Sequence, residues 1–150
     1  MGYFNQYVRA ESLEEAYGLY QKKNNFVLGG MLWLKMRKRP FGTAIDLSDL
    51  GLNQIEEDEK EFRIGAYVSL RELETNEALN AYTKGAFAES VKHIVGVQFR
   101  NVATVGGSLW GRYGFSDVMT IFRAMGAKVQ LHHTGILDLD EFVKMPRKTR

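Results

Sequence analysis

Two pairs of adjacent glycines stand where backbone amides could bind an anion. In the first, Val27-Leu28-Gly29-Gly30-Met31, a short apolar run expected to be a strand leads through the glycines into an expected helix. Free amide N–H groups and the positive end of a helix dipole attract negative charge, so this pattern favours a phosphate group. The alternative is a tight turn that needs glycine for its backbone conformation and binds nothing.

The second glycine pair lies in residues 98–108, where Thr104 and Ser108 flank Gly106 and Gly107 with hydroxyl groups. Such a loop can surround an oxyanion. Two glycine pairs in one small domain suit a ligand with two linked phosphates, each held by a different loop. The spacing alone does not tell whether the two loops converge.

Asp117 is the acidic residue best placed for ligand binding, because it directly follows Ser116, the expected N-cap of a helix. The helix dipole favours a carboxylate in the first turn, which is a sufficient structural reason for it. In dinucleotide sites, however, acidic residues accept hydrogen bonds from ribose hydroxyls. Residue type alone favours the structural interpretation.

The remaining candidate groups predict neither a metal site nor a catalytic residue. His132 and His133 are adjacent in an expected strand, so their side chains should point to opposite faces, and His93 has no partner that the sequence can assign. No Ser-His-Asp arrangement is present. Three aromatic residues beside the second glycine pair could shield a flat heterocycle, but packing is their commoner role. They are Trp110, Tyr113 and Phe115.

Capping residues and periodicity predict the elements that position these groups. Ser-x-x-Glu capping boxes predict a helix over residues 12–22 and a short helix after Ser69. Ser116 begins a helix with apolar residues at helical spacing that ends at Gly126. Further helices are expected at 31–39, 87–96 and 138–143, strands at 26–28, 43–47, 62–68 and 127–131, and a solvated hairpin tip at 56–61. The order predicts an α+β domain of two small α/β lobes, about 1–50 with the first glycine pair and about 51–150 with the second.

Composition limits the function further. A chain of 150 residues suits one domain, and 20 Lys and Arg against 18 Asp and Glu favour no nucleic-acid partner. No segment reaches the roughly 20 apolar residues that span a membrane, and the start does not resemble a signal peptide, so we expect a cytoplasmic chain without membrane contact. With no cysteine, the chain itself can hold neither an iron–sulfur cluster nor a thiol nucleophile.

Five segments in order carry a family resemblance: residues 26–30, 44–47, 64–73, 98–108 and 116–117. The most specific is Arg100-Asn101-Val102-Ala103-Thr104-Val105-Gly106-Gly107, of the form Arg-Asn-x-Ala-Thr-x-Gly-Gly. Together they resemble the FAD-binding domain of molybdenum hydroxylases, the flavoprotein subunits of xanthine dehydrogenase and carbon monoxide dehydrogenase type enzymes. This resemblance implies the PCMH-type fold and favours ligand binding over simple turns at both glycine pairs.

The resemblance also implies the cofactor, its contacts and the partners. FAD would lie against the first loop, the second loop, the cofactor-packing residue Ile94 and, on the adenosine side, Asp117. The first loop comprises Phe26, Val27, Leu28, Gly29, Gly30, Met31, Leu32 and Trp33, and the second Thr104, Val105, Gly106, Gly107 and Ser108. In this family the flavin receives electrons from an iron–sulfur subunit and passes them to NAD or oxygen, while a molybdopterin subunit oxidises the substrate. The chain is therefore expected to be an electron-transfer subunit of such an oxidoreductase.

Two departures from the family pattern leave an alternative open. Met31 stands where the family usually has Thr, which removes a hydroxyl that could donate to phosphate. Family members also continue into a C-terminal domain, and residues 146–149 resemble the segment just before it. We therefore expect either a separate chain that supplies this domain or a truncated copy. The alternative function is a non-catalytic assembly module of the same fold that has lost FAD binding.

Overall fold

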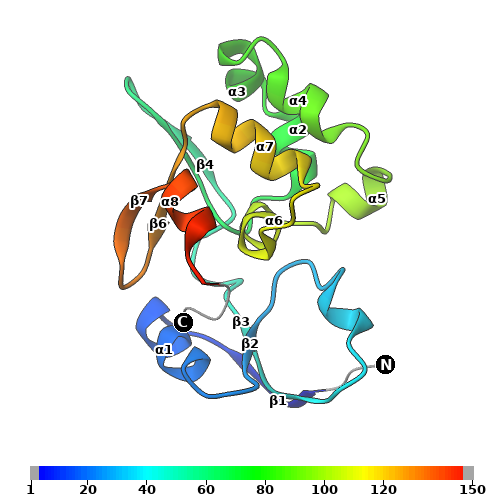
Figure 1. Ribbon diagram of the computed structural model, residues 1–150, viewed down its shortest axis with the longest axis vertical. Coiled ribbons are helices and arrows are strands. Elements are labelled where there is room, and N and C mark those ends of the chain that lie inside the picture. The colour runs from blue at the N-terminus through cyan, green and yellow to red at the C-terminus, as the bar shows by residue number, and fades with distance from the viewer. Residues whose placement is uncertain (1–3, 147–150) are drawn as a thin grey trace.

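The computed structural model describes residues 4–146 and has a small sheet with one helix at one end and a helical part at the other (Figure 1). The sheet is parallel, with strand order β1-β3-β2. Its elements are β1 (Phe4–Arg9), α1 (Leu13–Tyr20), β2 (Phe26–Val27) and β3 (Phe41–Asp46). We call residues 4–46 the N-terminal part. Its strand β1 was not expected from the sequence.

The rest of the described chain contains two antiparallel hairpins and seven short helices. The hairpins are β4 (Ile55–Glu57) with β5 (Phe62–Ile64) and β6 (Lys128–Leu131) with β7 (Gly135–Asp138). The helices are α2 (Leu70–Thr75), α3 (Glu77–Tyr82), α4 (Ala86–Val91), α5 (Val97–Arg100), α6 (Val105–Gly111), α7 (Asp117–Ala124) and α8 (Leu139–Lys144). The α+β class expected from the sequence is confirmed. Among residues 4–146, no helix has both the length and the apolar character that crossing a membrane requires.

Buried apolar residues form two clusters. The smaller joins α1 to the central strand β3 and includes Ala16 and Ile45. The larger lies among the helices and the hairpins and includes Leu73, Val91 and Phe122. The predicted serine caps are confirmed: the side chains of Ser12, Ser69 and Ser116 each accept an amide hydrogen bond at the start of α1, α2 and α7. Local capping therefore decides where these three helices begin.

Three expected elements are shorter than predicted. Residues 31–39 contain only one turn of 3-10 helix, η1 (Leu34–Met36), because Met31 before it is left-handed with φ of 62° and Arg37 after it is extended with ψ of 140°. The helix expected over 87–96 ends at Val91, with Lys92 as its C-cap, and the left-handed Val95, at φ of 53°, lies farther along the chain. The strand expected over 62–68 ends at Ile64, and its continuation bonds irregularly to residues 52–54.

The interpretation of the histidine pair was wrong in its geometry. Strand β6 ends at Leu131, so His132 and His133 lie in the turn before β7 and do not alternate across a sheet. Both imidazoles point to the same carboxylate, that of Glu14 on α1. The turn conformation brings together two side chains that a strand would separate.

Candidate cofactor site

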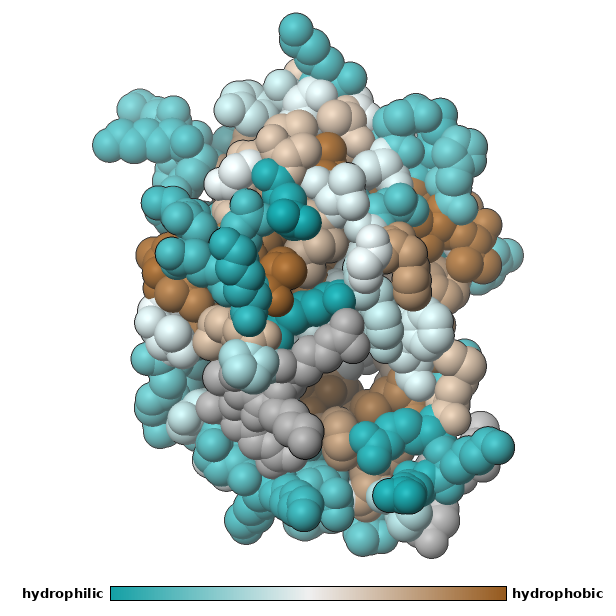
Figure 2. Space-filling model, in the orientation of Figure 1, coloured by the Kyte–Doolittle hydropathy of each residue, from teal (hydrophilic) through white to brown (hydrophobic). Residues whose placement is uncertain are grey.

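The two glycine loops meet at a pocket of about 370 Å³ between the N-terminal part and the helical part. The surface is hollowed between these parts on the face drawn in Figure 2. Strands β2 and β3 are parallel neighbours, so both end here, β2 just before Leu28 and β3 at Asp46. Ligands of α/β sheets commonly bind in such a crevice at the carboxyl ends of parallel strands. The lining residues are Leu28, Gly29, Gly30, Asp46, Ser48, Tyr67, Ser69, Asn101, Val102 and Thr104.

Glycine is required because the loops are in backbone contact. A Cβ atom at Gly30 would lie 2.0 Å from the carbonyl oxygen of Val102, and one at Gly29 would lie 3.0 Å from the hydroxyl oxygen of Thr104. No side chain fits at position 30 unless the loops separate. The first glycine pair therefore serves the close approach of two distant segments, and this approach forms one wall of the pocket.

The first loop offers a run of unused donors. The amide of Leu28 donates to the carbonyl of Ile45 at 2.8 Å and extends the sheet by one bond. The next five amides, those of residues 29–33, donate no hydrogen bond to any other described residue. Consecutive free amides in a turn that combines right-handed and left-handed residues form a concave anion site. The left-handed Met31 lies within this run.

The second loop differs, because the amides of Val105, Gly106, Gly107 and Ser108 are already bonded. Two of them donate to residues 66–68, which ties the loop to the chain before α2, and a third donates to the N-cap hydroxyl of α6. The pairs are Val105 with Val68 at 2.9 Å, Gly106 with Ala66 at 2.8 Å, and Gly107 with Thr104 at 3.1 Å. This loop therefore supplies shape and the Thr104 hydroxyl, whereas the first loop supplies the free amides.

Tyr67 holds the two strand ends together beneath the pocket. Its hydroxyl donates to the carbonyl of Leu28 and accepts from the amide of Leu47 at 3.1 Å. Burial raises the pKa of Tyr67, which keeps the hydroxyl protonated and able to donate. A residue of the helical part thus fixes the point where the first loop leaves β2.

The substitution Tyr67→Phe is expected to lower the free energy of unfolding by about 1–2 kcal/mol, because it leaves two backbone groups without their partner. Affinity for FAD should fall as well, since the first loop loses its anchor. Urea unfolding and flavin fluorescence titration measure the two effects. Tyr82→Phe is the matched control, since Tyr82 is 74% exposed. Equal unfolding free energies and equal FAD affinities of the two variants would refute the anchoring role of Tyr67.

Asp46 gives the pocket a negative charge. Burial acts to raise the pKa of Asp46, but hydrogen bonds from the hydroxyls of Ser48 and Tyr7 outweigh burial, and the pKa lies below its ordinary value. An ionised carboxylate repels phosphate but accepts hydrogen bonds from sugar hydroxyls. Asp46 was not among the expected site residues, although residues 44–47 belong to the family resemblance.

The expected site residues divide into two groups. Leu28, Gly29, Gly30 and Thr104 line the pocket, whereas all the other expected residues, Ile94 and Asp117 among them, do not. Phe26 and Val27 form strand β2, Met31, Leu32 and Trp33 continue the first loop, and Val105, Gly106, Gly107 and Ser108 begin α6.

Trp33 extends the first loop toward the segment that precedes α7. Its ring lies 5.4 Å from that of Tyr113 and 6.5 Å from that of Phe115, between ring centroids. Trp33 is 56% exposed and Phe115 is 71% exposed. The pair Tyr113 and Phe115 therefore joins the first loop in a surface aromatic cluster that ends two residues before Asp117.

The motif arginine, Arg100, points into the protein interior. Its guanidinium donates to both carboxylate oxygens of Glu74, at 2.8 and 3.1 Å, and to the carbonyl of Ile94 at 3.2 Å. The hydrogen bond from Arg100 holds the pKa of Glu74 below its ordinary value. Arg100 thus fixes α5, which precedes the second loop, to helix α2 and does not face the pocket.

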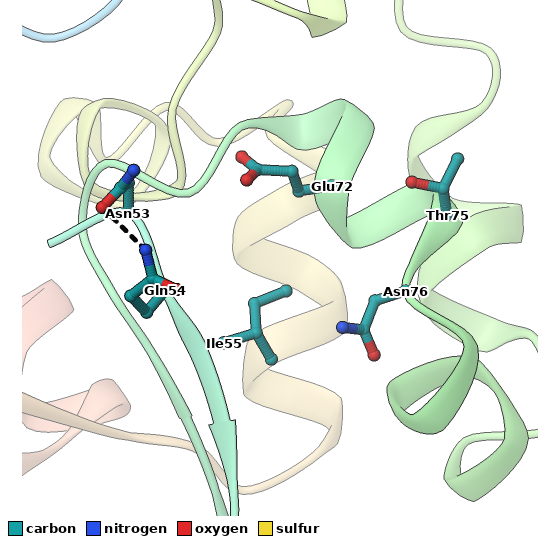
Figure 3. A pocket seen from close by; sticks show the side chains of 6 residues that line it. All are labelled: Asn53, Gln54, Ile55, Glu72, Thr75 and Asn76. Carbon is teal, nitrogen blue, oxygen red and sulfur yellow. Dashed lines mark hydrogen bonds between the residues drawn. The ribbon is translucent and has the colours of Figure 1, made fainter. Parts of the chain in front are cut away.

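A second hollow of about 280 Å³ lies between the β4 hairpin and α2 (Figure 3). Its polar side chains are engaged with their neighbours: Glu72 closes the capping box of α2, Asn76 caps α3, and Gln54 donates to Asn53 at 3.1 Å. The site therefore carries no feature that would recognise a ligand.

The fold agrees with comparisons to known proteins. The family described as the FAD binding domain in molybdopterin dehydrogenase matches residues 3–150, so the chain belongs to this family, and FAD is its cofactor. A curated relative, the uncharacterized protein YgfM of Escherichia coli, is 27% identical over 148 residues, which cover 94% of this chain and 54% of YgfM.

Solved structures show the same fold. A carbon monoxide dehydrogenase from Hydrogenophaga pseudoflava matches with a TM-score of 0.84 and 25% identity, over 96% of this chain and 53% of that one. Quinoline 2-oxidoreductase from Pseudomonas putida matches with a TM-score of 0.79 and 19% identity, over 99% of this chain and 53% of that one. The chain therefore spans about half the length of the relatives it matches.

Proposed function

We propose that the chain is the FAD-binding electron-transfer module of a molybdopterin-dependent dehydrogenase. The observation that carries this proposal is the pocket where β2 and β3 end, which Gly29 and Gly30 line. They begin a run of five consecutive amides, those of residues 29–33, that donate to no other described residue. A dinucleotide needs a backbone cradle for its diphosphate, and this loop has the amide donors for one.

Different polar groups of the site would bind different parts of FAD. The amides of residues 29–33 would hold the diphosphate, and the Thr104 hydroxyl would add a donor from the second loop. Asp46 and Ser48 would bind sugar or ribityl hydroxyls, because a carboxylate accepts from them and cannot accept from phosphate. When bound, the flavin supplies one-electron and two-electron redox chemistry. The chain's own contribution is to bind it, orient it and exclude water.

The partners in this proposal are an iron–sulfur subunit and a molybdopterin subunit. The absence of cysteine supports this division, because the thiolates that hold iron–sulfur clusters must come from outside these 150 residues. The similarity to a carbon monoxide dehydrogenase supports the kind of complex. Electrons would pass from the clusters to the flavin and then to NAD or oxygen, as in a xanthine dehydrogenase type enzyme.

Titration with FAD tests the binding step. Addition of the protein should quench flavin fluorescence, and FAD should co-elute with the chain, alone or in its reconstituted complex. A chain that stays colourless in both states yet co-purifies with iron–sulfur and molybdopterin subunits would favour the alternative, an assembly module that has lost the cofactor. Stoichiometric bound flavin would exclude that alternative.

Asp117 is proposed to contact the adenosine side of FAD, beside the aromatic cluster of Trp33, Tyr113 and Phe115. Replacing Asp117 with Asn should weaken FAD about tenfold, because hydrogen bonds to a charged group contribute roughly 1.5–3 kcal/mol. FMN lacks the adenosine, so its affinity should not change. Parallel fluorescence titrations with both flavins measure this difference, and an equal loss for both would contradict the assignment.

A further inference from the structure

Three potential metal ligands from distant segments converge at the surface, away from the cofactor pocket. Glu14 lies in the first turn of α1, and His132 and His133 occupy the turn between β6 and β7. The carboxylate oxygen Oε2 of Glu14 lies 3.0 Å from Nε2 of His132 and 3.4 Å from Nε2 of His133. The ligand atoms of the three residues all lie within 4.8 Å of one another.

These distances suit a single metal ion bound by all three residues. Zinc binds imidazole nitrogen and carboxylate oxygen at about 2.0–2.2 Å, so the edge of a tetrahedral site measures roughly 3.3 Å. Two of the three ligand pairs are already close to that separation. Two imidazoles with one carboxylate favour zinc and neighbouring transition metals over Mg²⁺ or Ca²⁺, which prefer oxygen ligands alone.

The ring of Tyr17 restricts the movement of the two histidine side chains. Tyr17 follows Glu14 by three positions on α1, so both side chains lie on one face of the helix. The Tyr17 ring stacks on His133 with centroids 3.8 Å apart and lies 6.0 Å from His132. Side-chain exposures of 34% for His132 and 48% for His133 leave room for water at the remaining coordination positions.

We propose that Glu14, His132 and His133 form a zinc site that fastens α1 to the β6–β7 turn. Glu14 and His132 are 118 residues apart in sequence. Since α1 packs on β3, whose end lines the cofactor pocket, bound zinc would join the N-terminal part to the helical part. A metal that binds only the folded chain raises its unfolding temperature. This inference does not depend on the proposed cofactor.

The test uses the whole chain without a histidine tag. Zinc chloride titrated by calorimetry should bind with one-to-one stoichiometry and raise the unfolding temperature, and EDTA should reverse the increase. Cobalt chloride should give the visible absorption of a low-symmetry nitrogen and oxygen site. The variants His132→Ala, His133→Ala and Glu14→Gln should each lose at least about 100-fold in zinc affinity, because removal of a ligand exceeds the effect of removing a supporting group. Circular dichroism checks that each variant is folded.

His93→Ala is the matched control, because His93 is exposed and lies on the segment after α4. It should bind zinc as the parent does. The proposal is overturned if the parent does not bind zinc, if a folded variant that lacks one of the three ligands binds with parental affinity, or if His93→Ala lowers the affinity equally. Tyr17→Ala should weaken zinc binding less than the loss of any ligand.

Discussion

Alanine at position 30 is expected to abolish high-affinity FAD binding. Its Cβ would lie 2.0 Å from the carbonyl oxygen and 2.7 Å from the carbonyl carbon of Val102, and these backbone atoms cannot rotate away. The two loops would have to separate, at a cost of about 1–3 kcal/mol in stability. Because the loops form the pocket together, we expect FAD affinity to fall by at least about 100-fold, the equivalent of 2.7 kcal/mol. Fluorescence titration with FAD measures this loss.

Gly18→Ala is the control for this substitution. Gly18 lies within α1, and no heavy atom of the described residues would lie within 4 Å of an added Cβ, apart from the helix's own backbone and chain neighbours. The change should stabilise the protein by about 0.8–1 kcal/mol, because alanine favours helix more than glycine does. FAD affinity should remain that of the parent. A Gly30→Ala protein that binds FAD normally would show that loop contact is not needed.

Glu74→Ala is expected to be the most destabilising single substitution proposed here, at about 3–5 kcal/mol, because it leaves the buried Arg100 without its carboxylate partner. The side chains are only 13% exposed at Glu74 and 6% exposed at Arg100, and two hydrogen bonds join them. Urea unfolding measures the loss. Glu89→Ala, which breaks the exposed pair with Lys92, should have little effect. Similar results for the two variants would contradict a structural role for the Glu74 pair.

The same pair predicts a pH dependence. The hydrogen bond from Arg100 lowers the pKa of Glu74 in the folded protein below its ordinary value. Its stabilisation is therefore complete above the ordinary pKa of about 4.3 and is lost as the pH falls through the lower, folded value. The stability difference between the parent and Glu74→Ala should shrink in acid. A stability difference that grew as the pH fell would contradict this prediction.

Local signals predicted the helices that begin at a serine cap, because a cap and a nearby glutamate or apolar stripe act within one or two turns. This holds for Ser12, Ser69 and Ser116. Strand β1 has no such local signal, because it is defined by pairing with β3, some 37 residues farther along the chain at Phe4 and Phe41. Met31 and Val95, both placed within expected helices, take left-handed conformations, which side chains of these types rarely adopt.

Some residues of the pocket could likewise be predicted from the sequence, and others could not. The glycine pairs stand out in the sequence because a missing Cβ is visible there, and structure adds the reason, which at Gly30 is contact with Val102. Asp46 and Tyr67 were missed because their place depends on the parallel pairing of β2 with β3 and on a long-range hydrogen bond to Leu28. Arg100 belongs to a recognisable motif, yet only its burial against Glu74 distinguishes a positioning residue from a ligand contact.

The most direct test of the account is a map of backbone amide chemical shifts in the nitrogen-labelled protein as FAD is added. The largest changes are predicted at the amides of residues 29–33, which have no partner among the described residues, with smaller changes at residues 104–108. Residues 53–55, at the other hollow, should not respond. Changes that leave residues 29–33 unaffected while FAD binds would contradict the proposal that this loop holds the diphosphate.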